Sequence, residues 1–208
     1  MILRMLEVGP LGTNCYIVGD ETTKEGIIID PGADGEFILK QVKALGLNIK
    51  MIVLTHSHID HIGALAEVKE ATGAEIAIHE DDAPSLQNQP FRMFFAKPSR
   101  PTPAHCRLLK EGDIINVGKF QFKVLHTPGH TEGGISLVGE DVVFTGDTLF
   151  NSSIGRADFP GASYNVEMDS IRNKLMTLPD DFKVYPGHGP SSTIGAERKS
   201  NPFLNSIM

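Results

Sequence analysis

The chain has 208 residues, enough for one sizeable hydrophobic core, and its 40% hydrophobic and 22% charged residues are ordinary for a folded protein. Its net charge of −7, with no cluster of lysines and arginines, disfavours a nucleic-acid partner. The longest apolar runs, such as 51–54, are too short to cross a bilayer, and residues 1–7 lack the features of a signal peptide. We therefore expect a cytoplasmic protein with no membrane partner.

The first half of the chain alternates between strand-like and helix-like segments. Strands are predicted over residues 14–18, 26–30, 50–54 and 75–79. The third of these is apolar, which is typical of a strand buried on both faces. Helices follow the second and third strands, one carrying Phe37, Ile38, Val42 and Leu45 before Gly46, the other carrying Leu65 and Val68 before Gly73. The order β-β-α-β-α-β predicts a sheet covered by helices.

Residues 83–105 interrupt this alternation with five prolines and an aromatic cluster at 91–95. A long loop of this composition is often a lid or a binding loop. A loop held on the surface by its own aromatic side chains has the same composition. The sequence leaves both interpretations of residues 83–105 open.

Strand patterns resume over 114–125, 134–138, 142–145 and 183–185, with a helix predicted over 166–178. Two β-rich halves that each end in a helix predict an α/β protein built as an αββα sandwich. The sequence contains no internal repeat and no linker-like stretch. We therefore expect residues 1–208 to form a single domain.

The segment Thr55-His56-Ser57-His58-Ile59-Asp60-His61 follows the predicted buried strand directly. Three histidines and an aspartate within six residues are difficult to explain as structural residues, because burying them costs free energy unless they are bonded or coordinated. Imidazole and carboxylate groups are the usual ligands of zinc and similar ions. This segment therefore indicates a metal site.

Three further candidate ligands occur at turns that follow apolar strands. They are His130 in Thr-Pro-Gly-His-Thr, Asp147 in Thr-Gly-Asp-Thr, and His188 in Pro-Gly-His-Gly. Each is preceded by a glycine, which allows a close backbone approach. Any one of them alone is typical of a turn, but together with the first segment they favour a shared metal site.

The motifs HxHxDH, TPGHT, TGDTLF and PGHG resemble those of the metallo-β-lactamase superfamily, and the resemblance extends from Asn14 to Phe203. It implies a metallo-β-lactamase-type αββα four-layer sandwich with two divalent metal ions. One ion would be held by His56, His58 and His130, and the other by Asp60, His61 and His188. Asp147 would bridge the two ions, and Asp30 would brace the metal loop by hydrogen bonding.

Two cations that share a water molecule lower its pKa enough to supply hydroxide near neutral pH. One cation can also stabilise the oxyanion that forms from a substrate carbonyl. Asp147 bridges the ions in this scheme, and Asp60 lies beside the hydroxide and can handle its proton. Such a site suits thioester hydrolysis, because a thiolate leaves without a general acid.

The sequence segments GDTLF and GRADF, together with PGHGP and NPF, are similar to those of the short glyoxalase II-like group. That resemblance implies hydrolysis of S-lactoylglutathione or a related hydroxyacyl thioester. The chain departs from full-length glyoxalase II in having no helical C-terminal domain, which puts the thiol carrier in doubt. Arg156 is a candidate clamp for a substrate carboxylate, although a structural ion pair with Asp158 or another acid is slightly favoured.

Other functions remain open from the sequence. The alternatives on the same fold are a mono-iron persulfide dioxygenase and a lactonase or other ester hydrolase. A metal-binding protein without catalytic activity is a further alternative, which the complete ligand set disfavours. Zinc is the expected metal from ligand type, but iron and manganese bind similar sites. The expected partner is a small-molecule substrate, and a homo-oligomer is left open.

Overall fold

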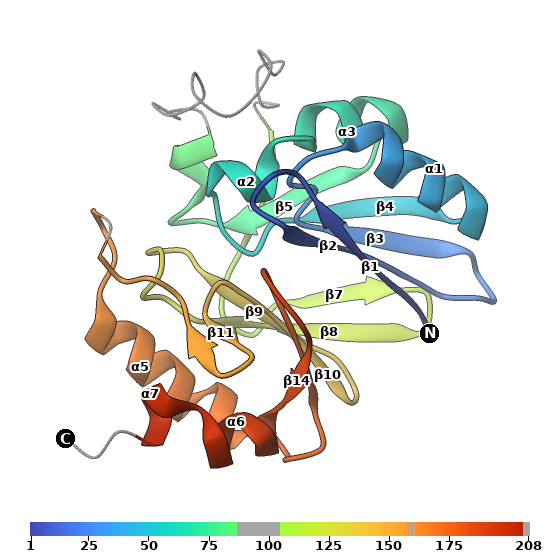
Figure 1. The fold of residues 1–208 in the computed structure, drawn as a ribbon. Helices are drawn as coiled ribbons and strands as arrows, with labels where there is room; N and C mark the ends of the chain where they lie inside the picture. Colours follow the sequence, from blue (N-terminus) through green and yellow to red (C-terminus); the bar gives the residue numbers. More distant parts are fainter. Residues whose placement is uncertain (87–104, 159, 206–208) are drawn as a thin grey trace.

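The protein is described by a computed structural model that covers residues 1–86, 105–158 and 160–205 (Figure 1). Within these residues the strands form two six-stranded sheets and one short hairpin. The first sheet has the spatial order β1 (Ile2–Val8), β2 (Thr13–Gly19), β3 (Glu25–Ile29), β4 (Asn48–Val53), β5 (Glu75–His79) and β6 (Arg107–Leu109). The second has the order β14 (Ser192–Thr193), β13 (Lys183–Pro186), β10 (Val142–Gly146), β9 (Ile135–Val138), β8 (Phe120–His126) and β7 (Ile114–Val117). The hairpin consists of β11 (Leu149–Phe150) and β12 (Ser153–Ile154).

Helices cover the outer faces of the two sheets (Figure 1). Those beside the first sheet are α1 (Gly35–Leu45), α2 (Ile59–Ile62) and α3 (Leu65–Thr72). Those beside the second sheet are α5 (Tyr164–Asn173), α6 (Ile194–Ser200) and α7 (Pro202–Asn205). Short 3₁₀ turns span Ala83–Leu86 and Leu175–Thr177.

Three hydrophobic layers confirm the αββα sandwich. The outer layer under α1 and α3 includes Ile38 and Val68. The layer between the sheets includes Tyr16 from the first and Phe144 from the second, whose rings meet edge to face at 5.0 Å. The layer under α5 and α6 includes Ile171 with seven other buried residues. Burial of apolar area in each layer holds the four layers together.

The strand directions bring the functional segments to one edge. Strands β3, β4, β5 and β6 run parallel, because helical crossovers connect β3 to β4 and β4 to β5. Strands β10 and β13 also run parallel, and β8 runs in the same direction because β9 is antiparallel to both β8 and β10. The carboxyl ends of these strands are the place where ligand-binding loops of α/β sheets usually lie.

The structure differs from the sequence-based expectations at several elements. Strands β1, β6, β11, β12 and β14 and helices α2, α6 and α7 were not expected. The strand pattern over 114–125 forms two strands that turn at Gly118, whose φ is 56°. The helix expected over 166–178 ends at Asn173, and a 3₁₀ turn follows it. Leu178 is extended because it precedes Pro179, and a residue before proline avoids the helical region.

Two expectations are not decided by this structure. Residues 87–104 of the segment 83–105 lie outside the described residues, so both interpretations of this segment stay open. The single domain expected for 1–208 also stays a prediction. Among the described residues, no helix is both long enough and apolar enough to span a bilayer.

We predict that Phe144→Ala lowers the free energy of unfolding by about 3–5 kcal/mol, because it empties a fully buried ring site between the two sheets. Urea denaturation of the purified variant measures this loss. Phe37→Ala is the matched control, since Phe37 is 43% exposed and should change stability little. An equal loss in the two variants would contradict the assignment of Phe144 to the central layer.

Candidate metal centre

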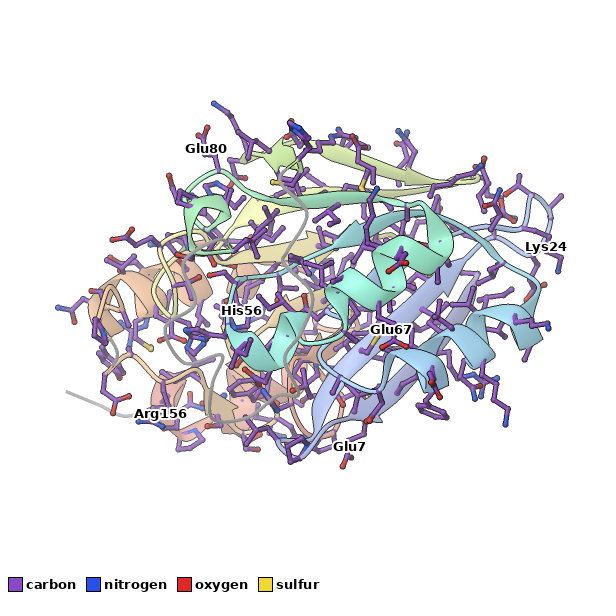
Figure 2. All side chains as sticks on the ribbon, turned by 90° about the horizontal axis from the view of Figure 1, so that it is seen from above. Glu7, Lys24, His56, Glu67, Glu80 and Arg156 are labelled. Carbon is purple, nitrogen blue, oxygen red and sulfur yellow. The ribbon has the colours of Figure 1, made fainter. Side chains whose placement is uncertain are left out.

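The seven residues predicted as metal ligands come from loops at the common strand edge. His56, His58 and the one-turn helix α2, which carries Asp60 and His61, follow β4. The other three ligands, His130, Asp147 and His188, follow β8, β10 and β13. Figure 2 marks His56 among side chains in the interior and Arg156 toward the outside of the molecule. The structure thus brings all seven predicted ligands together.

The ligands form two groups of three. In the first group, His56, His58 and His130 offer ligand atoms within 4.8 Å of one another, and His58 Nδ1 lies 2.9 Å from His130 Nε2. In the second group, Oδ2 of Asp60 lies 3.6 Å from His61 Nε2 and 3.1 Å from His188 Nε2. Each group has the number and type of donors that a divalent transition metal takes from a protein.

The carboxylate of Asp147 lies between the two groups. Its Oδ1 is 3.3 Å from His61 Nε2, and its Oδ2 is 3.6 Å from both His130 Nε2 and His188 Nε2. The distance from Oδ2 to His56 Nε2 is 4.0 Å. One side chain is therefore within reach of an ion in either group.

Buried polar atoms at the centre fit bound cations. Nε2 of His56, Nε2 of His61 and Oδ1 of Asp147 are buried and have no hydrogen-bond partner among the described residues. Buried polar atoms are ordinarily satisfied, and an ion is one of the standard explanations when they are not. The nitrogen and oxygen donor set suits zinc, iron or manganese.

Asp30 is the residue that orients the loop after β4. Its Oδ1 accepts a hydrogen bond from Thr55 N at 2.7 Å, and its Oδ2 accepts from Thr55 Oγ1 at 2.6 Å and from His61 Nδ1 at 2.9 Å. Asp30 has a φ of 50°, an uncommon conformation for a residue with a side chain. Backbone strain of this kind is typical of functional sites, where surrounding contacts hold it.

Backbone carbonyl groups orient two more rings. His130 Nδ1 donates to the carbonyl oxygen of Arg156 at 2.8 Å, and His188 Nδ1 donates to that of Leu11 at 3.1 Å. These bonds place the Nδ1 protons outward, so that Nε2 faces the centre. Ligand histidines in metal sites commonly donate their other ring N–H in this way.

Gly187 allows the closest approach in the centre. A Cβ atom at this position would lie 2.0 Å from Oδ1 of Asp147 and 2.8 Å from Cε1 of His61. Real Cβ atoms do not come so near, so only glycine fits between these two ligands. The glycine before His188 in the PGHG motif is therefore a packing requirement of the site.

The protonation states differ between the two groups of ligands. Burial lowers the pKa of His56 and lowers that of His58 to about 4, with neighbouring histidines adding to the effect. Burial alone would lower the pKa of His61, but the charges of Asp147 and Asp30 outweigh burial and raise this pKa above its usual value. Burial alone would raise the pKa of Asp147, yet the charge of His61 and other ring contacts hold it below its usual value. Ion binding here would release protons, as is usual for protein metal sites.

Sequence reasoning missed several supporting residues. Asp82, three residues after β5, accepts hydrogen bonds from Ser57 N and Gly133 N, both at 2.8 Å. Asn14 donates to the carbonyl oxygens of Pro186 and Gly189, at 3.0 and 2.8 Å. Asp82 follows a parallel strand as Asp30 does, and this position after a strand could have identified Asp82 from the sequence. Asn14 is a fully buried amide in an otherwise apolar strand, and it gave no comparable signal.

Glu167 of α5 was also missed. It is completely buried beneath the loops that carry His130 and Asp147, and neither carboxyl oxygen has a hydrogen-bond partner among the described residues. The helix packs so closely that a Cβ atom at Gly129 would lie 2.3 Å from Cα of Glu167. Burial raises the pKa of Glu167 to about 8, and the charge of Asp147 adds to the rise.

The backbone of Arg156 orients His130, whereas its side chain pairs with Asp158. Its guanidinium group donates to both carboxylate oxygens of Asp158, at 3.0 and 2.9 Å, and both side chains are more than half exposed. This is the ion pair that the sequence allowed as an alternative to a substrate clamp. An exposed pair of this type contributes little to stability.

We predict that Glu167→Gln removes a pH dependence of folding in chelator-treated protein. The folded state keeps the Glu167 proton up to about pH 8, whereas the unfolded chain releases it near 4.5, so stability falls as pH rises between these values. The slope that Gln removes is at most about 1.4 kcal/mol per pH unit. Urea denaturation from pH 5 to pH 8 measures it, with the exposed Glu140→Gln as control. A slope unchanged by Glu167→Gln would show that Glu167 is ionised in the folded protein.

Residues 8–188 match the family model described as the metallo-beta-lactamase superfamily. Among curated relatives, hydroxyacylglutathione hydrolase GloC of Haemophilus influenzae is 40% identical over 213 aligned residues, which cover 99% of each chain. Among solved structures, the B3 metallo-beta-lactamase BLEG-1 has a TM-score of 0.88 at 34% identity, with 99% of this chain and 100% of that chain covered. TTHA1623, solved in a di-iron-bound form, has a TM-score of 0.87 at 37% identity, with 97% and 100% covered. The chain belongs to the metallo-β-lactamase superfamily.

Proposed function

We propose that this protein hydrolyses a hydroxyacyl thioester, with S-lactoylglutathione as the first substrate to test. The observation that carries the proposal is the position of the Asp147 carboxylate between two complete groups of three ligand side chains. The 40% identity to a relative named hydroxyacylglutathione hydrolase supports the same reaction class. The coarser assignment, a metal-dependent hydrolase, follows from the family.

The residues that would hold two ions fall into the two groups already described. His56, His58 and His130 would hold one ion, Asp60, His61 and His188 would hold the other, and Asp147 would contact both. When bound, two such cations lower the pKa of a shared water and polarise a substrate carbonyl. Zinc is our proposal for the metal from the donor types, with iron and manganese as alternatives.

Asp60 is the residue proposed to handle a proton. Its side chain is 20% exposed, so it lies at the open side of the centre, and Thr13 Oγ1 donates to its Oδ2 at 3.2 Å. Burial would raise the pKa of Asp60, but a hydrogen bond from His188 and the charges of His61 and His188 hold it well below its usual value. Asp60 is therefore ionised at neutral pH, and its basicity in handling the proton is reduced.

The leaving group accounts for the choice of a thioester. A thiolate departs without a proton, so the chain needs no general acid beside the leaving group. The proposal then requires only a nucleophile, an oxyanion contact and a proton acceptor.

The competing functions on this fold are a mono-iron persulfide dioxygenase, a lactonase or other ester hydrolase, and a metal-binding protein without activity. The cytoplasmic location and the oligomeric state are separate predictions.

We predict that Asp147→Ala lowers kcat for S-lactoylglutathione by more than about 100-fold, the upper range for residues that only support a metal site. Asp147→Ala should also lower the metal content per chain, because the shared ligand is lost. Elemental analysis and thioester turnover before chelation, after chelation and after reloading measure both effects. The exposed Asp141→Ala is the matched control.

Other outcomes of that experiment decide between the alternatives. One iron per chain, with oxygen uptake on glutathione persulfide and no thioester hydrolysis, would support the dioxygenase. Two ions per chain without activity on either substrate would keep the hydrolase and remove this substrate class.

We predict that Arg156→Ala raises KM for S-lactoylglutathione about tenfold and leaves kcat nearly unchanged, if Arg156 binds a substrate carboxylate. Asp158→Asn provides the control, because it removes the ion-pair partner and leaves the guanidinium group in place. Steady-state kinetics of both variants at constant ionic strength give the comparison. A wild-type KM in Arg156→Ala would restrict Arg156 to its pair with Asp158.

A further inference from the structure

A second cluster of metal-binding side chains lies outside the proposed centre. His79 is the last residue of β5 and His126 is the last residue of β8, so one comes from each sheet. Their rings stack with centroids 3.9 Å apart and planes 13° from parallel. Neither histidine belongs to the sequence motifs that indicated the proposed centre. The fold brings the two together beside Asp81.

We propose that His79, His126 and Asp81 form an additional site for a divalent transition metal such as Zn²⁺. One ligand atom from each residue lies within 4.8 Å of the other two. The distance from His79 Nδ1 to Asp81 Oδ2 is 3.5 Å. Two ligands held about 2.1 Å from one ion at a tetrahedral angle are about 3.4 Å apart. The pair already has the spacing that a shared ion requires.

The hydrogen bonds of the two rings identify one acceptor nitrogen on each ring. His126 Nε2 lies 2.9 Å from the carbonyl oxygen of Glu132, to which it donates, so Nδ1 is the nitrogen left to bind an ion. Ligand histidines are typically oriented by such a bond to a carbonyl group. The backbone N–H of Asp81 donates to His79 Nδ1 at 3.3 Å, so this nitrogen is an acceptor, and an ion bound there would replace this hydrogen bond. Coordination by both rings would require the partly exposed His126 ring to turn out of its stacked position.

The charges around the cluster favour a cation. Four carboxylates lie near it, at Glu80, Asp81, Asp82 and Glu111. Two lysines face them, with Lys110 paired to Glu80 at 2.9 Å and Lys174 paired to Glu111 at 2.6 Å. Burial and the neighbouring His126 lower the pKa of His79, so its imidazole is neutral at neutral pH, as a metal ligand must be.

An ion at this site would connect the two sheets at the edge that carries the proposed centre. His79 is 4% exposed and is fixed in β5, while His126 belongs to β8 of the opposite sheet. Asp82, adjacent to Asp81, holds Ser57 N and Gly133 N in the ligand loops. The ion would therefore restrain the backbone on which Asp82 acts, without contacting substrate.

The test measures Zn²⁺ retained per chain after saturation and dialysis into metal-free buffer, by elemental analysis. Wild type, His126→Gln and Asp81→Asn are compared, with His105→Gln as the matched control because His105 is an exposed histidine outside both clusters. We expect His126→Gln and Asp81→Asn each to retain one equivalent fewer than wild type, and His105→Gln to retain the wild-type number. Asp81 is 51% exposed, so Asp81→Asn keeps the test valid if His126→Gln fails to fold.

A variant of the proposed centre separates the two hypotheses. His188→Gln should retain fewer ions at that centre than wild type. The double variant His188→Gln/Asp81→Asn should retain one equivalent of Zn²⁺ fewer than His188→Gln alone. Equal retention in wild type, His126→Gln and Asp81→Asn would overturn the additional site and make the stacked rings a contact between sheets only. That result would leave the proposed hydrolase untouched, because the hydrolase depends on His188 and Asp147 and not on Asp81.

Discussion

The carboxylate of Asp147 is only 11% exposed and lies within 4.0 Å of four histidine rings. A buried carboxylate is costly unless positive charge or hydrogen bonds compensate for its lost hydration. Here its Oδ1 has no hydrogen-bond partner among the described residues, and the facing nitrogen atoms of His56 and His61 have none either. The arrangement is therefore favourable with cations among these atoms, and the remaining loops serve to hold the donors in that geometry.

The supporting contacts come from fixed elements and not from the ligands themselves. Asp30 and Asp82 follow parallel strands of the first sheet and hold the backbone around His56, His58 and Gly133. Carbonyl groups of Arg156 and Leu11 orient His130 and His188 from the opposite side. Because each contact uses a rigid strand end or a short loop, the rings lose little additional conformational freedom on binding an ion.

The two sheets meet at this edge through polar as well as apolar contacts. Tyr16 packs on Phe144 in the central layer and also donates its hydroxyl to the carbonyl oxygen of Pro186 at 2.6 Å. The stacked His79 and His126 rings close the same edge farther along. One side of the interface thus carries both the hydrophobic packing that stabilises the fold and the polar groups that position the ligand loops.

Local patterns in the sequence were sufficient for most of the strands and for the αββα arrangement, and they singled out the seven candidate ligands that the structure brings together. They were sufficient because strand alternation, helix periodicity and closely spaced histidines are properties of short segments. The short helix α2 and the C-terminal helices escaped prediction, since segments of four to seven residues carry too little periodicity. Only the tertiary structure decided the supporting roles of Asn14, Asp82 and Glu167. It also decided the pairing of Arg156 with Asp158 and the contact between His79 and His126. Most of these contacts join residues far apart in the chain, up to 175 positions for Asn14 and Gly189, and only the packing of one sheet on the other determines which of them form.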